Sequence, residues 1–105
     1  MPDRPHLTLD RAEMRAFGYR IVDMIADHWA DLDRKPVAQT PAPGGISRAL
    51  AAPPPDGPAP VETVLEELRR DVFGHVAHIN HPRFFAFVPS PANFVSVMAE
   101  ALAAG

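Results

Sequence analysis

Hydrophobic and polar positions follow a helical period in two stretches of this 105-residue chain, with a proline-rich stretch between them. From Asp10 to Leu32 apolar side chains recur every three or four residues, which places them on one face of an amphipathic helix. That face is formed by Met14, Phe17, Ile21, Met24, Ile25, His28 and Leu32. Asp10 and Glu13 have the spacing of a capping box at the start of this helix. We therefore predict a helix over residues 10–32.

The apolar stripe of this first helix runs close to a heptad, at positions 14, 17, 21, 24 and 28. The predicted helices have no obvious way to cover one another, so we expect the stripe to pack against a second copy of the chain. Gly18 falls within the same helix, where glycine costs about 1 kcal/mol relative to alanine. It is either a tolerated glycine or a point where another helix approaches closely.

The segment 36–60 holds eight of the 13 prolines in the chain. The first helix should end before it, because Lys35 precedes a proline and is disfavoured in helical geometry. Within the segment, residues 46–51 (ISRALA) are expected to make one short helical turn. We divide the chain into an N-terminal helix (1–35), a proline-rich connector (36–60), a helix with an extended segment (61–88) and the start of a last helix (89–105).

A second amphipathic helix is predicted from Val61 to Phe73, with Gly74 as its stop signal. After it, the aromatic and β-branched residues from Phe84 to Val88 favour extended structure. The last helix is predicted to start with Ser90 as N-cap and proline as its first helical residue. It then runs into the apolar C-terminal end of the chain, which is how we expect a truncated polypeptide to end.

Composition and charge exclude several classes of protein. The chain is 47% hydrophobic and 22% charged, with a formal net charge of −3, which is ordinary for a globular protein. Its basic residues do not cluster, so we expect no nucleic-acid partner. It has no cysteine, which excludes disulfides and thiolate zinc sites. The polar N-terminus is no signal peptide, and no apolar run is long enough to span a membrane. We expect a cytoplasmic protein.

Three histidines, His75, His78 and His81, are spaced three residues apart. Imidazoles are good zinc ligands, but side chains at this spacing point to opposite faces of a strand, and no cysteine completes a site. We therefore predict structural histidines at a domain seam and no metal site. No serine lies in a G-x-S-x-G motif, and no glycine-rich phosphate loop is present.

Residues 81–90 read HPRFFAFVPS and are the most informative stretch of the chain. The pattern favours a buried strand that leads into a helix. A functional interpretation stands beside it. A helix N-terminus capped by Ser90 would attract a carboxylate or phosphate, and Phe87 and Val88 would form an apolar wall next to it. An apolar amino acid would suit such a site, because its carboxylate could bind the helix N-terminus and its side chain could contact the apolar wall.

This stretch, with the following PANFVSVMAEALAAG, resembles the F-F-A-[YF]-x-P-[TS] block of the group II decarboxylases that depend on pyridoxal phosphate (PLP), the aromatic-L-amino-acid decarboxylase family. Residues 14–25 (MRAFGYRIVDMI) resemble the opening F-R-x-x-G-x-x-x-V-D-x-I helix of that family. Residues 43–46 (PGGI) resemble its P-G-x-[LI] element. The resemblance covers residues 10–105, in the same order.

The resemblance implies a fold-type I PLP enzyme, α/β when complete, that is an obligate homodimer. Such an enzyme releases CO2 from an amino acid, here an aromatic L-amino acid, to give an amine in amino acid and carboxylic acid metabolism. This chain would be its mainly α, multi-helix N-terminal segment. Its dimer interface would be formed by Met14, Phe17, Ile21, Met24, Ile25 and His28. Its substrate contacts would be Phe87, Val88, Pro89 and Ser90.

Two departures from the family pattern leave the substrate open. Ile79 stands where a tryptophan is common, and Val88 stands where a second aromatic residue often follows. Lys35, the one lysine of the chain, lies beside the proline-rich connector without the aspartate, histidine and phosphate loop that PLP requires. We therefore expect no catalytic residue here, an inactive chain in isolation, and a PLP lysine elsewhere in the full-length enzyme. The alternative is a non-catalytic helical interaction module derived from such an enzyme.

Overall fold

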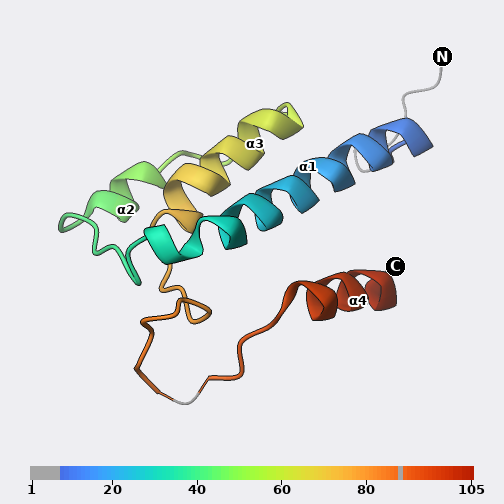
Figure 1. Cartoon of the computed structure of the whole chain (residues 1–105). Coiled ribbons are helices and arrows are strands. Elements are labelled where there is room, and N and C mark those ends of the chain that lie inside the picture. Colours follow the sequence, from blue (N-terminus) through green and yellow to red (C-terminus); the bar gives the residue numbers. More distant parts are fainter. Residues whose placement is uncertain (1–7, 88) are drawn as a thin grey trace.

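A computed structural model describes residues 8–87 and 89–105, which fold into helices and loops without any strand (Figure 1). The helical elements, in chain order, are α1 (Arg11–Ala30), η1 (Leu32–Arg34), α2 (Gly45–Ala49), α3 (Val61–Glu67), η2 (Leu68–Phe73) and α4 (Phe94–Ala104). The mainly α class is therefore confirmed. None of these helices is both long and apolar enough to cross a membrane.

Helix α1 begins at the predicted capping box. The Asp10 carboxylate accepts the Glu13 backbone N–H at 2.9 Å, and the Glu13 carboxylate accepts the Asp10 N–H at 2.8 Å. The two bonds satisfy N–H groups that the first turn of a helix leaves without intrahelical partners. At its other end α1 stops at Ala30, two residues before the predicted limit. The chain tightens into the 3₁₀ turn η1, and Leu32 becomes buried.

The connector is irregular except for α2, which spans five residues close to the predicted turn. Gly44 precedes α2 with φ 72°, in the left-handed region where only glycine is free of strain. Helix α3 begins at Val61 as predicted. It continues without a break into η2, which has the wider π-helical winding and ends at Phe73. A Cβ on Gly74 would lie 2.8 Å from the Arg70 carbonyl oxygen, so only glycine fits this helix end.

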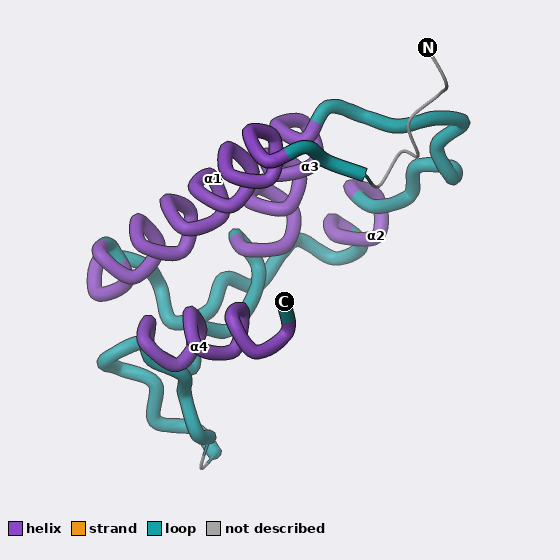
Figure 2. The backbone as a smooth tube through the Cα atoms, turned by 90° about the vertical axis from the view of Figure 1, so that its right-hand side faces the viewer, coloured by secondary structure: helices purple, strands orange, loops and turns teal. Residues whose placement is uncertain are grey.

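Helices α3 and η2 lie alongside α1, as both views of the chain show (Figures 1 and 2). At one end Arg20 of α1 donates to both carboxylate oxygens of Glu62 at 3.0 Å. At the other end the His28 and Phe73 rings are 6.0 Å apart. The expectation that the helices would leave one another uncovered is therefore partly wrong, because α3 and η2 cover part of the α1 stripe.

The fold is nevertheless open and has a very small core. Its radius of gyration is 16.8 Å, against about 13 Å for a compact domain of this length. Its accessible surface is 8,636 Å², against about 5,800 Å² for a compact protein of this mass. Leu32 and Leu65 are the buried apolar residues of the described chain, while Met14 on α1 is 55% exposed. Much apolar surface is therefore left for other polypeptide to cover.

The predicted start of the last helix is wrong. Helix α4 begins at Phe94, with Asn93 rather than Ser90 as its N-cap. The Asn93 side chain accepts the Ser96 backbone N–H at 2.9 Å, and the Ser96 hydroxyl accepts the Asn93 N–H at 3.1 Å. These two bonds form a complete capping box, so Ser90 and Pro91 stay in the loop that leads to α4.

Candidate functional site

The aromatic block of the sequence forms an exposed loop in the structure. Phe85 is 90% exposed and Phe87 is 93% exposed, and neither belongs to a strand. Phe87 has φ 59°, a left-handed conformation that residues with a Cβ seldom adopt. The predicted buried strand is thus wrong, because a strand must pair its backbone groups and no strand partner exists among the described residues. We call residues 81–92 the aromatic loop.

The aromatic loop is held at its base by side chains. His81 is 4% exposed, and its Nε2 lies 2.7 Å from the Lys35 carbonyl oxygen, 46 residues away in the sequence. Its Nδ1 accepts the backbone N–H of Arg83 at 3.0 Å. At the far end of the loop, the Asn80 amide donates to the Ala92 carbonyl oxygen at 2.8 Å. The loop therefore projects from two fixed points, while the rings of Phe85 and Phe87 face solvent.

The four residues expected to contact a substrate fall within this loop or at its edge. Phe87, Pro89 and Ser90 are exposed, and Val88 lies outside the described residues. Because α4 starts at Phe94, Ser90 does not cap a helix. The prediction of an apolar wall next to a helix N-terminus at Ser90 is therefore wrong. The loop can offer aromatic rings and a hydroxyl to a ligand, but no pair of groups suited to acid–base chemistry.

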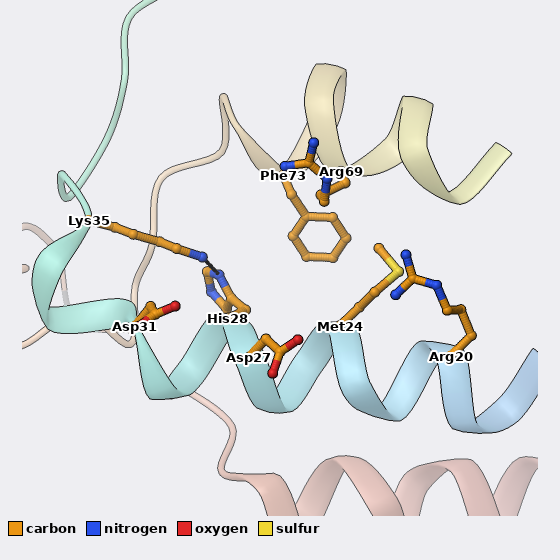
Figure 3. Close-up of a pocket in the computed structure, with 8 residues that line it drawn as sticks. All are labelled: Arg20, Met24, Asp27, His28, Asp31, Lys35, Arg69 and Phe73. Atoms are coloured by element: carbon orange, nitrogen blue, oxygen red, sulfur yellow. Dashed lines mark hydrogen bonds between the residues drawn. The ribbon is translucent and has the colours of Figure 1, made fainter. Parts of the chain in front are cut away.

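A cavity of about 290 Å³ lies between α1 and η2 (Figure 3). Its lining residues are Arg20, Met24, Asp27, His28, Asp31, Lys35, Arg69 and Phe73. Lys35 Nζ lies 3.0 Å from His28 Nδ1. Burial, and then the nearby charge of Lys35, lower the pKa of His28 below its ordinary value. The same two causes lower the pKa of His78, whose ring centroid lies 4.8 Å from that of His28.

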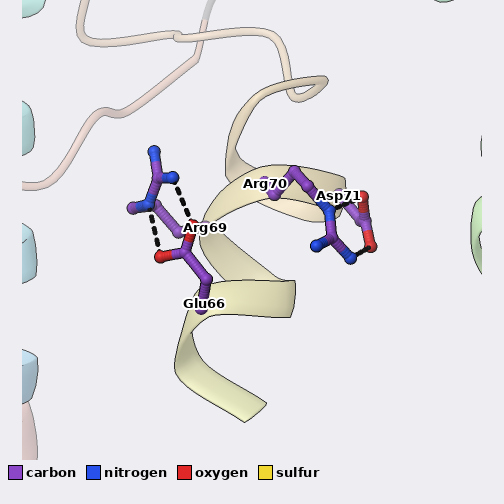
Figure 4. A network of polar contacts seen from close by, with 4 residues as sticks. All are labelled: Glu66, Arg69, Arg70 and Asp71. Carbon is purple, nitrogen blue, oxygen red and sulfur yellow. Dashed lines mark hydrogen bonds and ion pairs between the residues drawn. The ribbon is translucent and has the colours of Figure 1, made fainter. Parts of the chain in front are cut away.

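Four charged side chains at the end of α3 and in η2 form two ion pairs (Figure 4). Arg69 Nε donates to Glu66 at 2.9 Å, and Arg70 donates to both carboxylate oxygens of Asp71 at 2.8 and 2.7 Å. The hydrogen bonds from Arg70 lower the pKa of Asp71, and those from Arg69 lower the pKa of Glu66. Asp71 is buried, whereas Glu66 is exposed. Both remain structural ion pairs.

The three histidines contact different parts of the chain. His75 Nδ1 lies 3.1 Å from the Asp71 carbonyl oxygen, at the end of its own helix. The His78 ring packs against the His28 ring at a tilt of 55°, and His81 bonds to Lys35. Over residues 8–87 and 89–105, no three His, Cys, Asp or Glu side chains are grouped to hold a metal ion. Sequence reasoning identified these histidines but missed their partners on α1 and at Lys35.

The residues that line the cavity do not form a PLP site, although they include a lysine, carboxylates and arginines. Lys35 Nζ is hydrogen-bonded to His28, and Arg20 and Arg69 are paired with Glu62 and Glu66. The cavity also adjoins the C-terminal parts of α1 and η2, where the helix dipole disfavours a phosphate. The surroundings of Lys35, the one lysine of the chain, therefore do not suit PLP.

Comparison with known proteins finds relatives that match nearly the whole chain, although no protein-family model matches it. An aromatic-L-amino-acid decarboxylase of Bacillus atrophaeus is 40% identical over 100 residues, which cover 95% of this chain and 21% of the relative. A tyrosine decarboxylase of Oryza sativa subsp. japonica is 39% identical, over 94% of this chain and 19% of the relative. A phenylacetaldehyde synthase of Petunia hybrida is 34% identical, over 92% and 19%.

Solved structures of plant proteins have a fold similar to that of this chain. The crystal structure of Oryza sativa TDC with PLP and tryptamine superposes with a TM-score of 0.83 at 29% identity, over 95% of this chain and 20% of that chain. Tryptophan decarboxylase of Catharanthus roseus, in complex with L-tryptophan, has the same fold, with a TM-score of 0.82 at 24% identity. The chain thus spans about a fifth of the length of the proteins it matches.

Proposed function

Because this chain is a homologue of the N-terminal segment of the aromatic-amino-acid decarboxylases, we propose that it serves as that segment in a PLP-dependent decarboxylase. The complete enzyme would release CO2 from an aromatic L-amino acid and leave the amine. The observation that carries the proposal is the aromatic loop, whose rings at Phe85 and Phe87 are almost fully exposed. Large apolar side chains left in solvent mark a surface that is covered when the protein works.

In this proposal the tip of the aromatic loop forms one wall of the substrate pocket. Phe87, Val88 and Pro89 would contact the substrate side chain, and the Ser90 hydroxyl would offer a hydrogen bond at its edge. Contact between two aromatic rings contributes a favourable interaction energy in addition to that of the apolar area it buries. PLP, bound by other residues of the complete protein, would supply the electron sink for decarboxylation. The role of this chain is to bind and orient the amino acid.

The second part of the proposal concerns dimerisation through α1. Met14 remains 55% exposed and Phe17 39% exposed even though α3 lies alongside the helix. The proposed interface comprises Met14, Phe17, Ile21, Met24, Ile25 and His28. A two-fold copy of the same stripe is the simplest way to bury it. The end of the stripe near Met14 is the freest, since His28 is already packed on Phe73 and His78.

The test uses the complete protein that carries this chain, loaded with PLP and assayed on aromatic and aliphatic L-amino acids. We expect CO2 release from aromatic substrates and a raised KM for them in Phe87→Leu and Ser90→Ala. Ser47→Ala, which removes an exposed hydroxyl in α2, is the matched control and should leave KM unchanged. Amine and aldehyde should both be measured, because the relatives include decarboxylases and phenylacetaldehyde synthases.

Two outcomes would contradict these proposals. No CO2 release from any aromatic amino acid would favour the alternative of a non-catalytic interaction module. A compact monomer in sedimentation analysis of the complete protein would contradict the interface on α1, whatever the activity.

A further inference from the structure

His81 is almost fully buried, and both of its ring nitrogens take part in hydrogen bonds. Nδ1 accepts the Arg83 backbone N–H, so the ring proton lies on Nε2 and is donated to the Lys35 carbonyl oxygen at 2.7 Å. One bond fixes the first turn of the aromatic loop. The other ties that turn to the residue that follows η1. A backbone bond from His78 N–H to the Val37 carbonyl oxygen, at 2.8 Å, joins the same two segments of the chain.

Asn80 fixes the opposite end of the loop. Its amide donates to the Ala92 carbonyl oxygen at 2.8 Å, across twelve residues. The chain therefore returns to its starting point just before Asn93 caps α4. Between these anchors the Phe84 N–H donates to the His81 carbonyl oxygen at 3.0 Å. The described residues of the loop (81–87 and 89–92) have few such internal bonds, so the position of the loop depends on its ends.

We propose that His81 and Asn80 are positioning residues, which hold the aromatic loop in the place where its tip meets the substrate side chain. This inference rests on the proposed function of the loop. Neither side chain belongs to the tip at Phe87. Each acts through backbone carbonyl groups, His81 through Lys35 and Asn80 through Ala92. Their loss should therefore weaken substrate binding without altering the groups that contact the substrate or the cofactor.

The geometry allows the two bonds of His81 to be separated. In His81→Asn the amide oxygen replaces Nδ1 and still accepts from Arg83, but the side chain no longer reaches Lys35. In His81→Gln the amide nitrogen replaces Nε2 and still donates to Lys35. Asn80→Asp removes the donor to Ala92. His75→Asn is the matched control, because the His75 ring bonds to the Asp71 carbonyl oxygen at the end of its own helix, outside the aromatic loop.

The experiment measures KM, kcat and bound PLP per chain for these variants of the complete protein, with aromatic substrates. His81→Asn and Asn80→Asp should each raise KM roughly 3- to 10-fold, as expected for loss of one hydrogen bond. Bound PLP should stay at the wild-type level, and His75→Asn should match wild type in all three quantities. A purely structural role would instead lower bound PLP and the active fraction while KM stayed constant.

Hydrogen–deuterium exchange gives a second readout that needs no activity. Exchange of the peptide from His81 to Phe87 should become faster in His81→Asn and Asn80→Asp, and stay at the wild-type rate in His75→Asn. Unchanged KM in an active, folded Asn80→Asp or His81→Asn protein overturns the inference, even if exchange is faster. If the His81 variants do not fold, Asn80→Asp decides alone. A wild-type protein without decarboxylase activity overturns the proposed function instead, a result distinct from any difference between variants.

Discussion

Lys35 Nζ and His28 Nδ1 are 3.0 Å apart, joined by a hydrogen bond that connects the residue after η1 to the last turns of α1. An ammonium group has no lone pair, so the imidazole accepts this bond and carries its proton on Nε2. His28 is also packed against His78, with ring centroids 4.8 Å apart. This arrangement depends on both imidazoles being neutral, because protonation would bring three positive charges together.

The stability of the protein should therefore depend on pH. The pKa values of His28 and His78 are both lowered from 6.5 in the folded state, by burial first and then by the charge of Lys35. Below pH 6.5 the unfolded chain binds more protons than the folded one, so acid favours unfolding. We expect the melting temperature to be constant above pH 6.5 and to fall as the pH drops through the lowered pKa values. Thermal melts from pH 8 to pH 5 measure this.

The control for this prediction is His28→Asn, whose side-chain oxygen can accept from Lys35 but does not titrate. Its melting temperature should fall less between pH 7 and pH 5 than that of the wild type. Other charged groups around the cavity, unchanged in the variant, are Arg20, Asp27, Asp31 and Arg69. Parallel pH profiles for the two proteins would show that His28 does not contribute.

Gly18 offers a test of what covers α1. A Cβ at this position would meet no heavy atom of another element within 4 Å among the described residues, so none of the described helices approaches closely here. Gly18→Ala should then stabilise the isolated helix by about 1 kcal/mol. If a second copy packs tightly over this turn, the same change should weaken the dimer. Urea denaturation and sedimentation equilibrium of the complete protein distinguish the two results.

Because the core is small, side-chain truncations at neighbouring positions of α3 should differ in how far they lower the stability of the protein. Leu65 is 4% exposed and its neighbour Val64 is 44% exposed. Leu65→Ala should lower the free energy of unfolding by about 2–4 kcal/mol, because it removes a buried side chain and leaves a cavity. Val64→Ala removes partly exposed atoms and should cost less than about 1 kcal/mol. Equal losses in urea denaturation would mean that Val64 is buried against further polypeptide.

Local sequence signals predicted much of this fold because they act over three or four residues. The capping box of Asp10 and Glu13 and the stop at Gly74 are complete within one turn, and both are present in the structure. The change to π-helical winding after Glu67 was not predicted, because the apolar spacing is the same through both parts of that helix.

The aromatic loop and the start of α4 could not be predicted, because contacts distant in sequence decide them. In a helix starting at Pro91, the Ala92 carbonyl oxygen would accept the Ser96 N–H. In the structure that oxygen accepts from Asn80 instead, and Asn93 caps Ser96. The bond from His81 to Lys35 spans 46 residues, and no periodicity reports such a contact.

The start of α4 can be tested by removing the side chain of each candidate N-cap residue. Asn93→Ala removes a side chain that accepts the Ser96 N–H and should cost about 1 kcal/mol of stability. Ser90→Ala should leave stability within about 0.5 kcal/mol of wild type, because Ser90 is exposed and caps nothing. Urea denaturation of both variants measures the difference. If Ser90→Ala were instead the less stable of the two variants, Ser90 would be the N-cap of α4.

Phe87 combines an exposed ring with a left-handed backbone at φ 59°. That conformation costs about 1–2 kcal/mol for a residue with a Cβ, whereas glycine adopts it freely. Phe87→Gly and Phe87→Ala both delete the ring, so their difference reports the backbone alone. We expect the glycine variant to be about 1 kcal/mol more stable in urea denaturation, and both variants to raise KM for aromatic substrates. An alanine variant as stable as the glycine variant would mean that the loop is relaxed at this residue. The phenylalanine would then be held there by packing against other polypeptide rather than by the loop itself.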